Sequence, residues 1–222
     1  MIKNTDKFQI YYERMIAFNE KVNLTAITDR QEVFIKHFED SLRLADAVPD
    51  VDNSEYKLID VGTGAGFPGL PIAIEHPGVE VTLTDALDKR LNFLRELTDE
   101  LGLNNVKIVH ARAEDLGHDP EFREKFDIAT CRAVSNLSTI VEYCTPLIHK
   151  GGLFIPLKSG EVISEVEAAS NAIRVLACKI KGIQTYELSE DMGSRSLIII
   201  EKTSTTPQKY PRKAGTPSKK PL

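Results

Sequence analysis

Residues 58–69 read Leu-Ile-Asp-Val-Gly-Thr-Gly-Ala-Gly-Phe-Pro-Gly. A short apolar run ends with the acid Asp60 and Val61, and four glycines follow before an apolar pattern of helical type from Leu70 to Glu75. Glycine lets the backbone adopt positive φ and lets a ligand approach without an intervening Cβ. The stretch therefore predicts a strand, a tight turn and the start of a helix, with a flat or anionic ligand on the turn.

Two ligand classes use such a turn. Residues 64–69 satisfy the dinucleotide pattern G-x-G-x-x-G, which alone is weak evidence. From Asp60, the stretch reads acid-x-Gly-x-Gly-x-Gly, which resembles motif I of the class I S-adenosylmethionine (SAM) methyltransferases. A carboxylate at Asp60 would repel a pyrophosphate, but it could hydrogen-bond the ammonium of a methionine moiety. SAM is favoured, an NAD-dependent oxidoreductase is the alternative, and a structural turn without a ligand is the third interpretation.

Strand and helix patterns alternate along residues 56–202. Apolar runs typical of strands occupy residues 57–61, 79–84, 106–110, 126–131 and 153–158. Helical patterns lie between and after them, at residues 70–75, 87–101, 137–148 and 161–181. Two further strands, at residues 182–188 and 196–202, have no helix between them and predict an antiparallel hairpin. We expect an α/β protein with a Rossmann-like, mostly parallel seven-stranded sheet that ends in this hairpin.

The two ends of the chain differ from this central pattern. Residues 6–22, and a second stretch that begins near Asp29 and ends before Pro49, have apolar residues at helical spacing. They predict an N-terminal helical cap over residues 1–50, ahead of a core over residues 51–202 and a tail over residues 203–222. His37, Asp40 and Ser41 lie together on the second helix, where local hydrogen bonding is the favoured interpretation.

Charge is unevenly distributed along the chain. The formal net charge of the 222 residues is −5, yet residues 202–222 contain six Lys or Arg and no Asp or Glu. A basic tail on an acidic body is typical of nucleic-acid binding, although a solvated, disordered tail has the same composition. Three separated cysteines suit a reducing compartment, and no spacing suggests a metal site. Without a signal peptide or a membrane-spanning run, we expect a cytoplasmic protein.

Ligands of open α/β sheets bind beyond the carboxyl ends of the strands, so polar residues there are candidates. The second strand is followed by Asp85, 19 residues after Gly66, where an acid can accept hydrogen bonds from both ribose hydroxyls. The alternative is a helix N-cap paired with Asp88. After the third strand, Ala113 is small enough for an adenine ring to approach, and Glu114 could accept its exocyclic amine.

The residues at the end of the fourth strand lack motifs that are typical of other methyl acceptors. Residues 130–134 contain no Asn/Asp-Pro-Pro-aromatic stretch of the kind common in enzymes that methylate an adenine amine. Cys131 is a weak candidate for the nucleophile of cytosine-C5 methylation, because no Pro-Cys dipeptide accompanies it, and a packing role is favoured. Arg132 is the remaining polar candidate at this strand end.

The chain resembles the glucose-inhibited division protein B family, the bacterial guanine-N7 methyltransferases of small-subunit ribosomal RNA. Matching stretches run through nearly the whole chain: Asn23-Leu24-Thr25, His37 with Asp40-Ser41-Leu42, residues 60–71, Asp85 with Lys89-Arg90 and Phe93-Leu94, residues 112–114, residues 132–134, Gly151-Gly152 with Leu157-Lys158, and residues 209–217. One departure is Ser159 before Gly160, where Lys-Gly or Lys-Ala would be expected.

The resemblance implies SAM contacts at Gly62, Phe67, Ala113, Glu114 and Arg132. With the residues already derived, the candidate cofactor-binding set is Asp60, Gly62, Gly64, Gly66, Phe67, Asp85, Ala113, Glu114 and Arg132. The implied acceptor, guanine N7, carries a lone pair and no proton, so no catalytic acid or base is assigned. Arg132 is a candidate for positioning the guanine through O6, since N7 must stay free.

The implied partner is 16S ribosomal RNA or the small ribosomal subunit, bound by a monomer and away from membranes. Four residues near the sheet edge are expected to meet phosphates: Lys89, Arg90, Arg112 and Lys158. Four more lie in the tail, where the tyrosine could stack on an unpaired base: Lys209, Tyr210, Arg212 and Lys213. Deletion after Lys202 would then weaken RNA binding and leave SAM affinity unchanged. A non-catalytic RNA-binding assembly factor is the alternative function.

Overall fold

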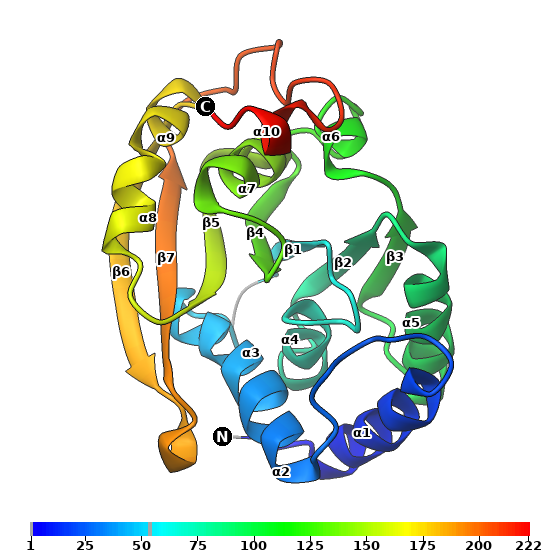
Figure 1. The fold of residues 1–222 in the computed structure, drawn as a ribbon. Helices are drawn as coiled ribbons and strands as arrows, with labels where there is room; N and C mark the ends of the chain where they lie inside the picture. Colours follow the sequence, from blue (N-terminus) through cyan, green and yellow to red (C-terminus); the bar gives the residue numbers. More distant parts are fainter. Residues whose placement is uncertain (1, 53–54) are drawn as a thin grey trace.

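The computed structural model describes residues 2–52 and 55–222. A seven-stranded sheet crosses the molecule in the order β3-β2-β1-β4-β5-β7-β6 (Figure 1). Its strands are β1 (Lys57–Val61), β2 (Glu80–Asp85), β3 (Val106–His110), β4 (Phe126–Arg132), β5 (Ile148–Ser159), β6 (Cys178–Glu187) and β7 (Ser194–Lys202). The strands β1 to β5 pair in parallel, and β7 runs antiparallel to both β5 and β6. The predicted α/β sheet with a terminal hairpin is confirmed.

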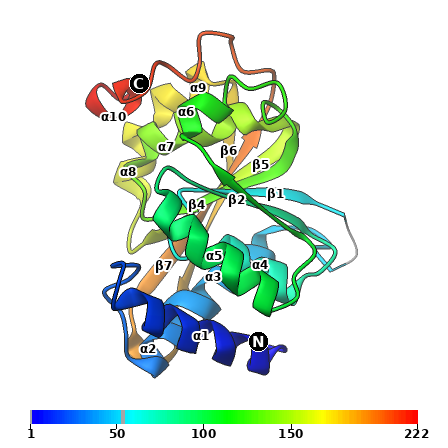
Figure 2. The same ribbon diagram turned by 90° about the vertical axis from the view of Figure 1, so that its right-hand side faces the viewer.

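Helices cover both faces of the sheet (Figure 2). They are α1 (Thr5–Asn19), α2 (Arg30–Val33), α3 (Asp40–Leu42), α4 (Gly69–Glu75), α5 (Asp88–Glu100), α6 (Ala113–Leu116), α7 (Leu137–Cys144), α8 (Ile163–Ala168), α9 (Ser170–Val175) and α10 (Thr216–Lys219). The helices α1 to α5 lie on one face, and α6 to α10 lie on the other. No helix in the described ranges is both long and apolar enough to cross a membrane.

Three predicted helices differ in detail from the structure. The helix expected at residues 161–181 is two short helices, α8 and α9, which meet at Ala169 with φ −86° and ψ 0°. It also ends early, because Ala177 takes a left-handed φ of 58° and β6 begins at the next residue. The helix expected at residues 137–148 ends at Cys144, where a 3₁₀ turn containing Pro146 leads into β5. The second cap helix is α2, a π-helical turn at Phe34–Glu39, and α3 in succession.

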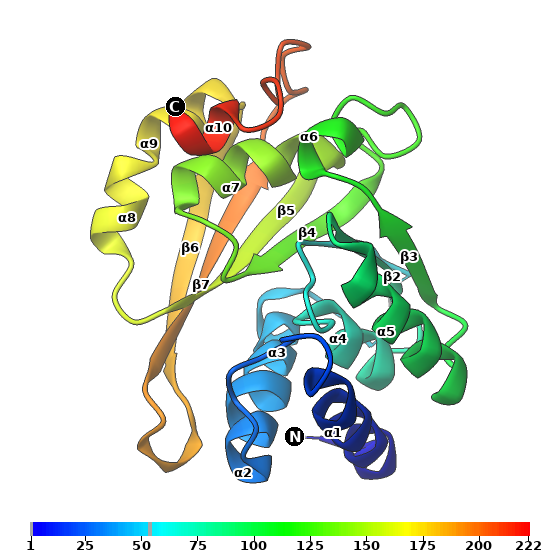
Figure 3. The ribbon, with the colours of Figure 1, turned by 45° about the vertical axis from the view of Figure 1, so that its right-hand side comes forward.

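The N-terminal cap packs into the core beneath the sheet (Figure 3). Phe8, Tyr11 and Met15 of α1 are fully buried in one apolar cluster with residues of β1, α4 and α5. The ring of Tyr11 stacks on Phe67 with centroids 5.3 Å apart, and its hydroxyl donates to the Ala65 carbonyl at 2.5 Å. Burial of several aromatic side chains of this size contributes on the order of 2 kcal/mol each. The cap therefore fixes the glycine turn from below.

The C-terminal segment, residues 203–222, crosses the opposite face beside α6 and α7 (Figures 1 and 3). Tyr210 and Pro217 of this segment are buried. Thus the two ends of the chain cover opposite faces of the same sheet, and both reach the strand ends where a ligand is expected.

Candidate active site

Asp60 organises the glycine turn from inside the protein. Its side chain is fully buried, and Oδ2 accepts from the Thr63 hydroxyl at 2.7 Å and from the Gly69 amide at 2.8 Å. Oδ1 has no hydrogen-bond partner among the described residues. Burial raises the pKa of Asp60 to about 6, against the lowering effect of those hydrogen bonds. The expected contact with a methionine ammonium is corrected: Asp60 is enclosed and shapes the turn.

The glycines of the turn serve different purposes. A Cβ at Gly66 would lie 2.5 Å from the Tyr11 hydroxyl, and one at Gly69 would lie 2.6 Å from Leu83. Close packing against the protein therefore requires these two glycines, and the cofactor contact expected for Gly66 stays a prediction. Gly64, with φ +61°, has open space at the Cβ position. Of these three glycines, Gly66 and Gly69 are needed for packing, and Gly64 is the one with space for a ligand.

Asp85 at the end of β2 is tied to the same turn. Its Oδ2 accepts from the Gly64 amide at 3.0 Å and from Arg90 at 3.3 Å, while Oδ1 accepts from the Leu87 amide at 2.9 Å. The alternative role as N-cap of the following helix does not hold, because Leu87 occupies the N-cap position of α5. Asp85 joins the ends of β1 and β2 and lines the cavity above them.

That cavity, which we call the glycine-turn cavity, has a volume of about 370 Å³. It lies at the carboxyl ends of the first four strands and is lined by Gly62, Asp85, Ala113, Glu114 and Ala133, among others. The volume suits a small ligand. Backbone at Gly62, a small side chain at Ala113 and two buried carboxylates fit a nucleoside with free hydroxyls and an amine. These residues would hold the nucleoside part of SAM.

Arg132, at the end of β4, is held by the second cap helix. Its guanidinium donates to Asp40 Oδ2 at 2.9 Å and to the Lys36 carbonyl at 3.2 Å, and it lies 4.9 Å from the centre of the Phe67 ring. The His37 ring stacks on the Phe67 ring, and the two ring centroids lie 4.7 Å apart. Asp40 is buried. The predicted local role of His37 and Asp40 is therefore incomplete, because both contact Arg132, with His37 Nδ1 3.2 Å from the guanidinium.

Two residues that sequence reasoning missed complete this cluster. The Tyr186 hydroxyl donates to Asp40 Oδ1 at 2.8 Å, and the Arg195 guanidinium lies 3.9 Å from the same oxygen. They belong to β6 and β7, so only the pairing of the hairpin brings them here. The π-helical turn before Asp40 is a distortion that is frequent at functional sites, but it is seen only in the structure, because no periodicity of the sequence reveals it.

A second cavity lies beside this cluster, and we call it the Arg132 cavity. Its volume is about 390 Å³, and four cations line it together with His37 and Asp40: Lys36, Arg132, Lys158 and Arg195. Burial lowers the pKa of His37 to about 3, with the positive charge of Arg132 as the second cause. His37 is therefore neutral at physiological pH. Ala133, with a left-handed φ of 55°, lines both cavities.

The residues predicted to contact SAM are divided between the glycine-turn cavity and the Arg132 cavity. Gly62, Ala113 and Glu114 line the glycine-turn cavity. Arg132 lines the Arg132 cavity instead, and Phe67 is buried beneath it, with 6% of its surface exposed. Cys131 is also buried, at 1%. A thiol enclosed in an apolar cluster suits the packing role and not that of a nucleophile.

The predicted RNA-binding residues at the sheet edge differ in availability. Lys89 and Arg112 are exposed. Arg90 is paired with Asp85 at 3.3 Å, and the Lys158 ammonium donates to Glu165 at 2.7 Å and to the Ser135 carbonyl at 2.9 Å. Arg90 and Lys158 thus have structural partners that phosphate contacts would have to share.

The predicted RNA-binding residues of the tail need a stronger correction. Tyr210 is 6% exposed, so it is not available to stack on a base. The Arg212 guanidinium donates to both carboxylate oxygens of the fully buried Glu142, at 2.7 to 3.1 Å. Lys209 and Lys213 remain exposed. The tail is folded onto the protein because its apolar and charged residues find buried partners.

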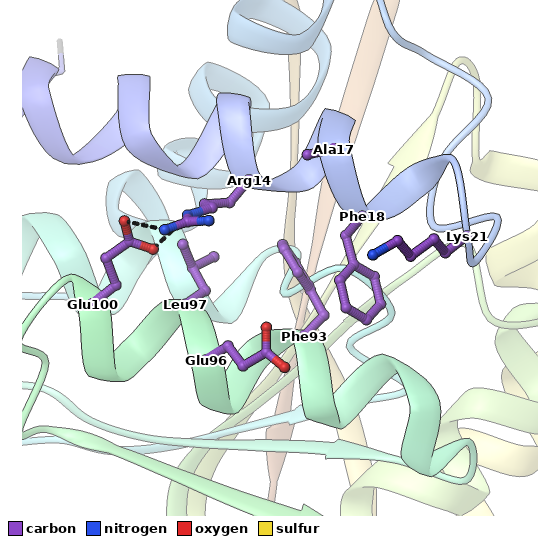
Figure 4. Close-up of a pocket in the computed structure, with 8 residues that line it drawn as sticks. All are labelled: Arg14, Ala17, Phe18, Lys21, Phe93, Glu96, Leu97 and Glu100. Carbon is purple, nitrogen blue, oxygen red and sulfur yellow. Dashed lines mark hydrogen bonds and ion pairs between the residues drawn. The ribbon is translucent and has the colours of Figure 1, made fainter.

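A further cavity, of about 610 Å³, lies between α1 and α5 (Figure 4). Its lining includes Phe18 and Phe93, and the Arg14 guanidinium pairs with Glu100 across one end, at 2.6 and 2.9 Å. None of its lining residues belongs to a strand end. It is separate from the candidate site.

The sheet order and the strand-end residues define a SAM-dependent methyltransferase of class I. Solved structures with this fold include a SAM-dependent methyltransferase from Aquifex aeolicus, with a TM-score of 0.57 and 16% identity over 78% of this chain and 94% of that one. A SAM-dependent O-methyltransferase from Thermotoga maritima has a TM-score of 0.58 and 15% identity over 87% of this chain and 72% of that one.

The family model for rRNA small subunit methyltransferase G matches residues 4–196. The ribosomal RNA small subunit methyltransferase G of Lactobacillus johnsonii is 48% identical over 99% of this chain and 92% of that protein. The enzyme of the same name from Desulfitobacterium hafniense is 49% identical over 98% and 89%. The chain belongs to this methyltransferase family, and its cofactor is SAM, which settles the choice against NAD.

Proposed function

We propose that the protein transfers the methyl group of SAM to N7 of a guanine in 16S ribosomal RNA. The observation that carries the proposal is the meeting of the two cavities at Ala133. The glycine-turn cavity has the chemistry for a nucleoside cofactor. The Arg132 cavity has the positive charge and hydrogen-bond donors for a nucleotide of the substrate RNA. The RNA substrate itself is consistent with the names of the relatives.

The residues around the Arg132 cavity supply positioning and not proton transfer. SAM would supply an electrophilic methyl group on a sulfonium. The proton-free lone pair of guanine N7 would form the new N–CH3 bond while the S–CH3 bond breaks and S-adenosylhomocysteine leaves. A general base is therefore unnecessary. Aligning two bound reactants is worth roughly 7 to 11 kcal/mol of the barrier, and the rigid hold of Asp40 on Arg132 suits this role.

The charge of Arg132 would otherwise oppose a cationic donor nearby. Asp40 and the Phe67 ring face compensate for it. In our proposal, the guanidinium donates to guanine O6 from one side and leaves N7 free. Arg195 is placed to meet the phosphates that flank the methylated nucleotide, as is Lys36, which would share its charge with Glu32. The exposed Lys89 and Arg112 extend this positive edge.

The proposal is tested by methyl transfer in vitro. The protein is incubated with radiolabelled SAM and with unmethylated 16S RNA, either naked or assembled into small subunits, and 23S RNA is the control. We expect label in one of the two 16S samples and in 7-methylguanosine after digestion. Binding of 16S RNA without methyl transfer to any sample would support the assembly factor instead, and label in another nucleoside would contradict the choice of N7.

A further inference from the structure

The C-terminal segment borders the glycine-turn cavity. Gly215 and Ser218 line it, together with Tyr143 of α7. We propose that this segment is a fixed wall of the SAM site that sets cofactor affinity by holding Glu114 in place. The proposal reverses one half of the expectation from composition, because loss of the segment should weaken SAM binding and not leave it unchanged. It depends on SAM as the cofactor and not on which base is methylated.

The direct link is a hydrogen bond between Gly215 and Glu114. The Gly215 amide donates to Glu114 Oε1 at 3.0 Å, and the Glu114 side chain is buried beside the cavity. Gly215 adopts a φ of 78°, in the left-handed region that glycine occupies without strain. Tyr143 lines the same cavity as Glu114, and burial, followed by the charge of Glu114, raises the pKa of its phenol. The segment thus orients the acid assigned to the nucleoside.

The segment is anchored to the protein on both sides of Gly215. Before it, Arg212 forms its two-oxygen ion pair with buried Glu142 of α7, and Pro211 packs so closely on Gly117 that a Cβ there would lie 2.6 Å away. After it, the Thr139 hydroxyl of α7 donates to the Pro217 carbonyl at 3.2 Å. Anchors on both sides hold the Gly215 amide in one place, as a wall requires.

The exposed cations of the segment allow the wall to be tested apart from its charge. Lys219 and Lys220 are exposed and lie beyond the residues that touch the cavity. A chain that ends at Lys213 loses Gly215, Pro217 and Ser218 together with these two charges. The double variant Lys219→Ala/Lys220→Ala loses the same charges and keeps the wall, so it is the matched control.

The test is calorimetric titration of each protein with SAM, alongside RNA binding measured without SAM. We expect the shortened chain to bind SAM at least tenfold more weakly, while the double variant stays within twofold of the full chain. Both should lose RNA affinity to a similar extent. A folded shortened chain, checked by circular dichroism, that binds SAM like the full chain would overturn the proposal.

A second measurement uses the intact protein, so that unfolding of the shortened chain does not decide the matter. Hydrogen exchange is followed at residues 214–219 with and without saturating SAM, and residues 189–193 in the distant hairpin loop serve as the reference. We expect SAM to slow exchange in the C-terminal segment and not in the reference loop. Equal exchange with and without SAM at residues 214–219 would contradict a wall of the cofactor site.

Discussion

The Arg132 guanidinium and the Asp40 carboxylate form a hydrogen-bonded ion pair of 2.9 Å between the end of β4 and the N-terminal cap. Asp40 is 2% exposed and Arg132 is 15% exposed. An ion pair this enclosed is screened far less than a surface pair. The cap thereby borders the candidate active site, because it fixes the orientation of the arginine beside Ala133.

Replacement of Asp40 by Asn should impair catalysis more than cofactor binding. The variant leaves Arg132 without its counter-charge, and misplacement of a positioning group by about 1 Å can cost roughly 10²-fold in rate. We expect kcat/KM for RNA methylation to fall by about that factor, while the Kd for SAM changes less than threefold. The control is Asp46→Asn, which removes a half-exposed partner of Arg43. Equal activity of the two variants would show that the Asp40 pair is only structural.

The rate of methyl transfer should depend little on pH. The pKa of His37 is lowered to about 3, so this side chain stays neutral throughout the working range, and guanine N7 needs no base. Single-turnover rates at saturating SAM should vary less than about twofold between about pH 6.5 and 8.5. His37→Gln should keep the same flat profile. A limb with a pKa near 7 that disappears in His37→Gln would mean that the histidine transfers a proton.

Asp60 should make the stability of the fold pH-dependent. Its folded pKa of about 6 is raised above the ordinary value of 3.8, so the folded protein binds this proton more tightly than the unfolded chain. The stabilising contribution is complete below pH 3.8 and is lost as the pH rises through 6. Between pH 4 and 7.5, the free energy of unfolding of the wild type relative to Asp60→Asn should fall by roughly 2 kcal/mol. Urea unfolding measures this, with the exposed Asp99→Asn as the baseline, and parallel curves for the wild type and Asp60→Asn would refute it.

The basic residues of the tail should differ sharply in their effect on stability. Arg212→Gln leaves the buried Glu142 carboxylate unpaired, which costs roughly 3 kcal/mol. Lys213→Gln, at the next and exposed position, should change the free energy of unfolding by less than about 0.5 kcal/mol. Thermal and urea unfolding compare the two, since both remove one positive charge. Similar stabilities would mean that the tail is not packed on α7.

The sequence predicted most where a local pattern has one physical cause. The strands and the hairpin follow from alternating apolar runs, and the turn after β1 follows from its glycines. The sequence did not predict the roles of residues whose partners are distant along the chain. Composition marked Arg212 as free to bind phosphate, because Glu142 lies 70 residues away. Likewise, Gly66 owes its identity to Tyr11, and Asp40 gains its role from Arg132 and Tyr186. Such pairings exist only after the sheet has assembled.

Guanine N7 is the proposed methyl acceptor, and chemical cleavage of the RNA tests that atom directly. Methylation at N7 makes the guanine sensitive to borohydride reduction, after which aniline cuts the RNA chain at that nucleotide. We predict one cleavage in 16S RNA treated with the protein and SAM, absent when either is omitted. Methyl groups incorporated into 16S RNA without any aniline-sensitive position would contradict the account.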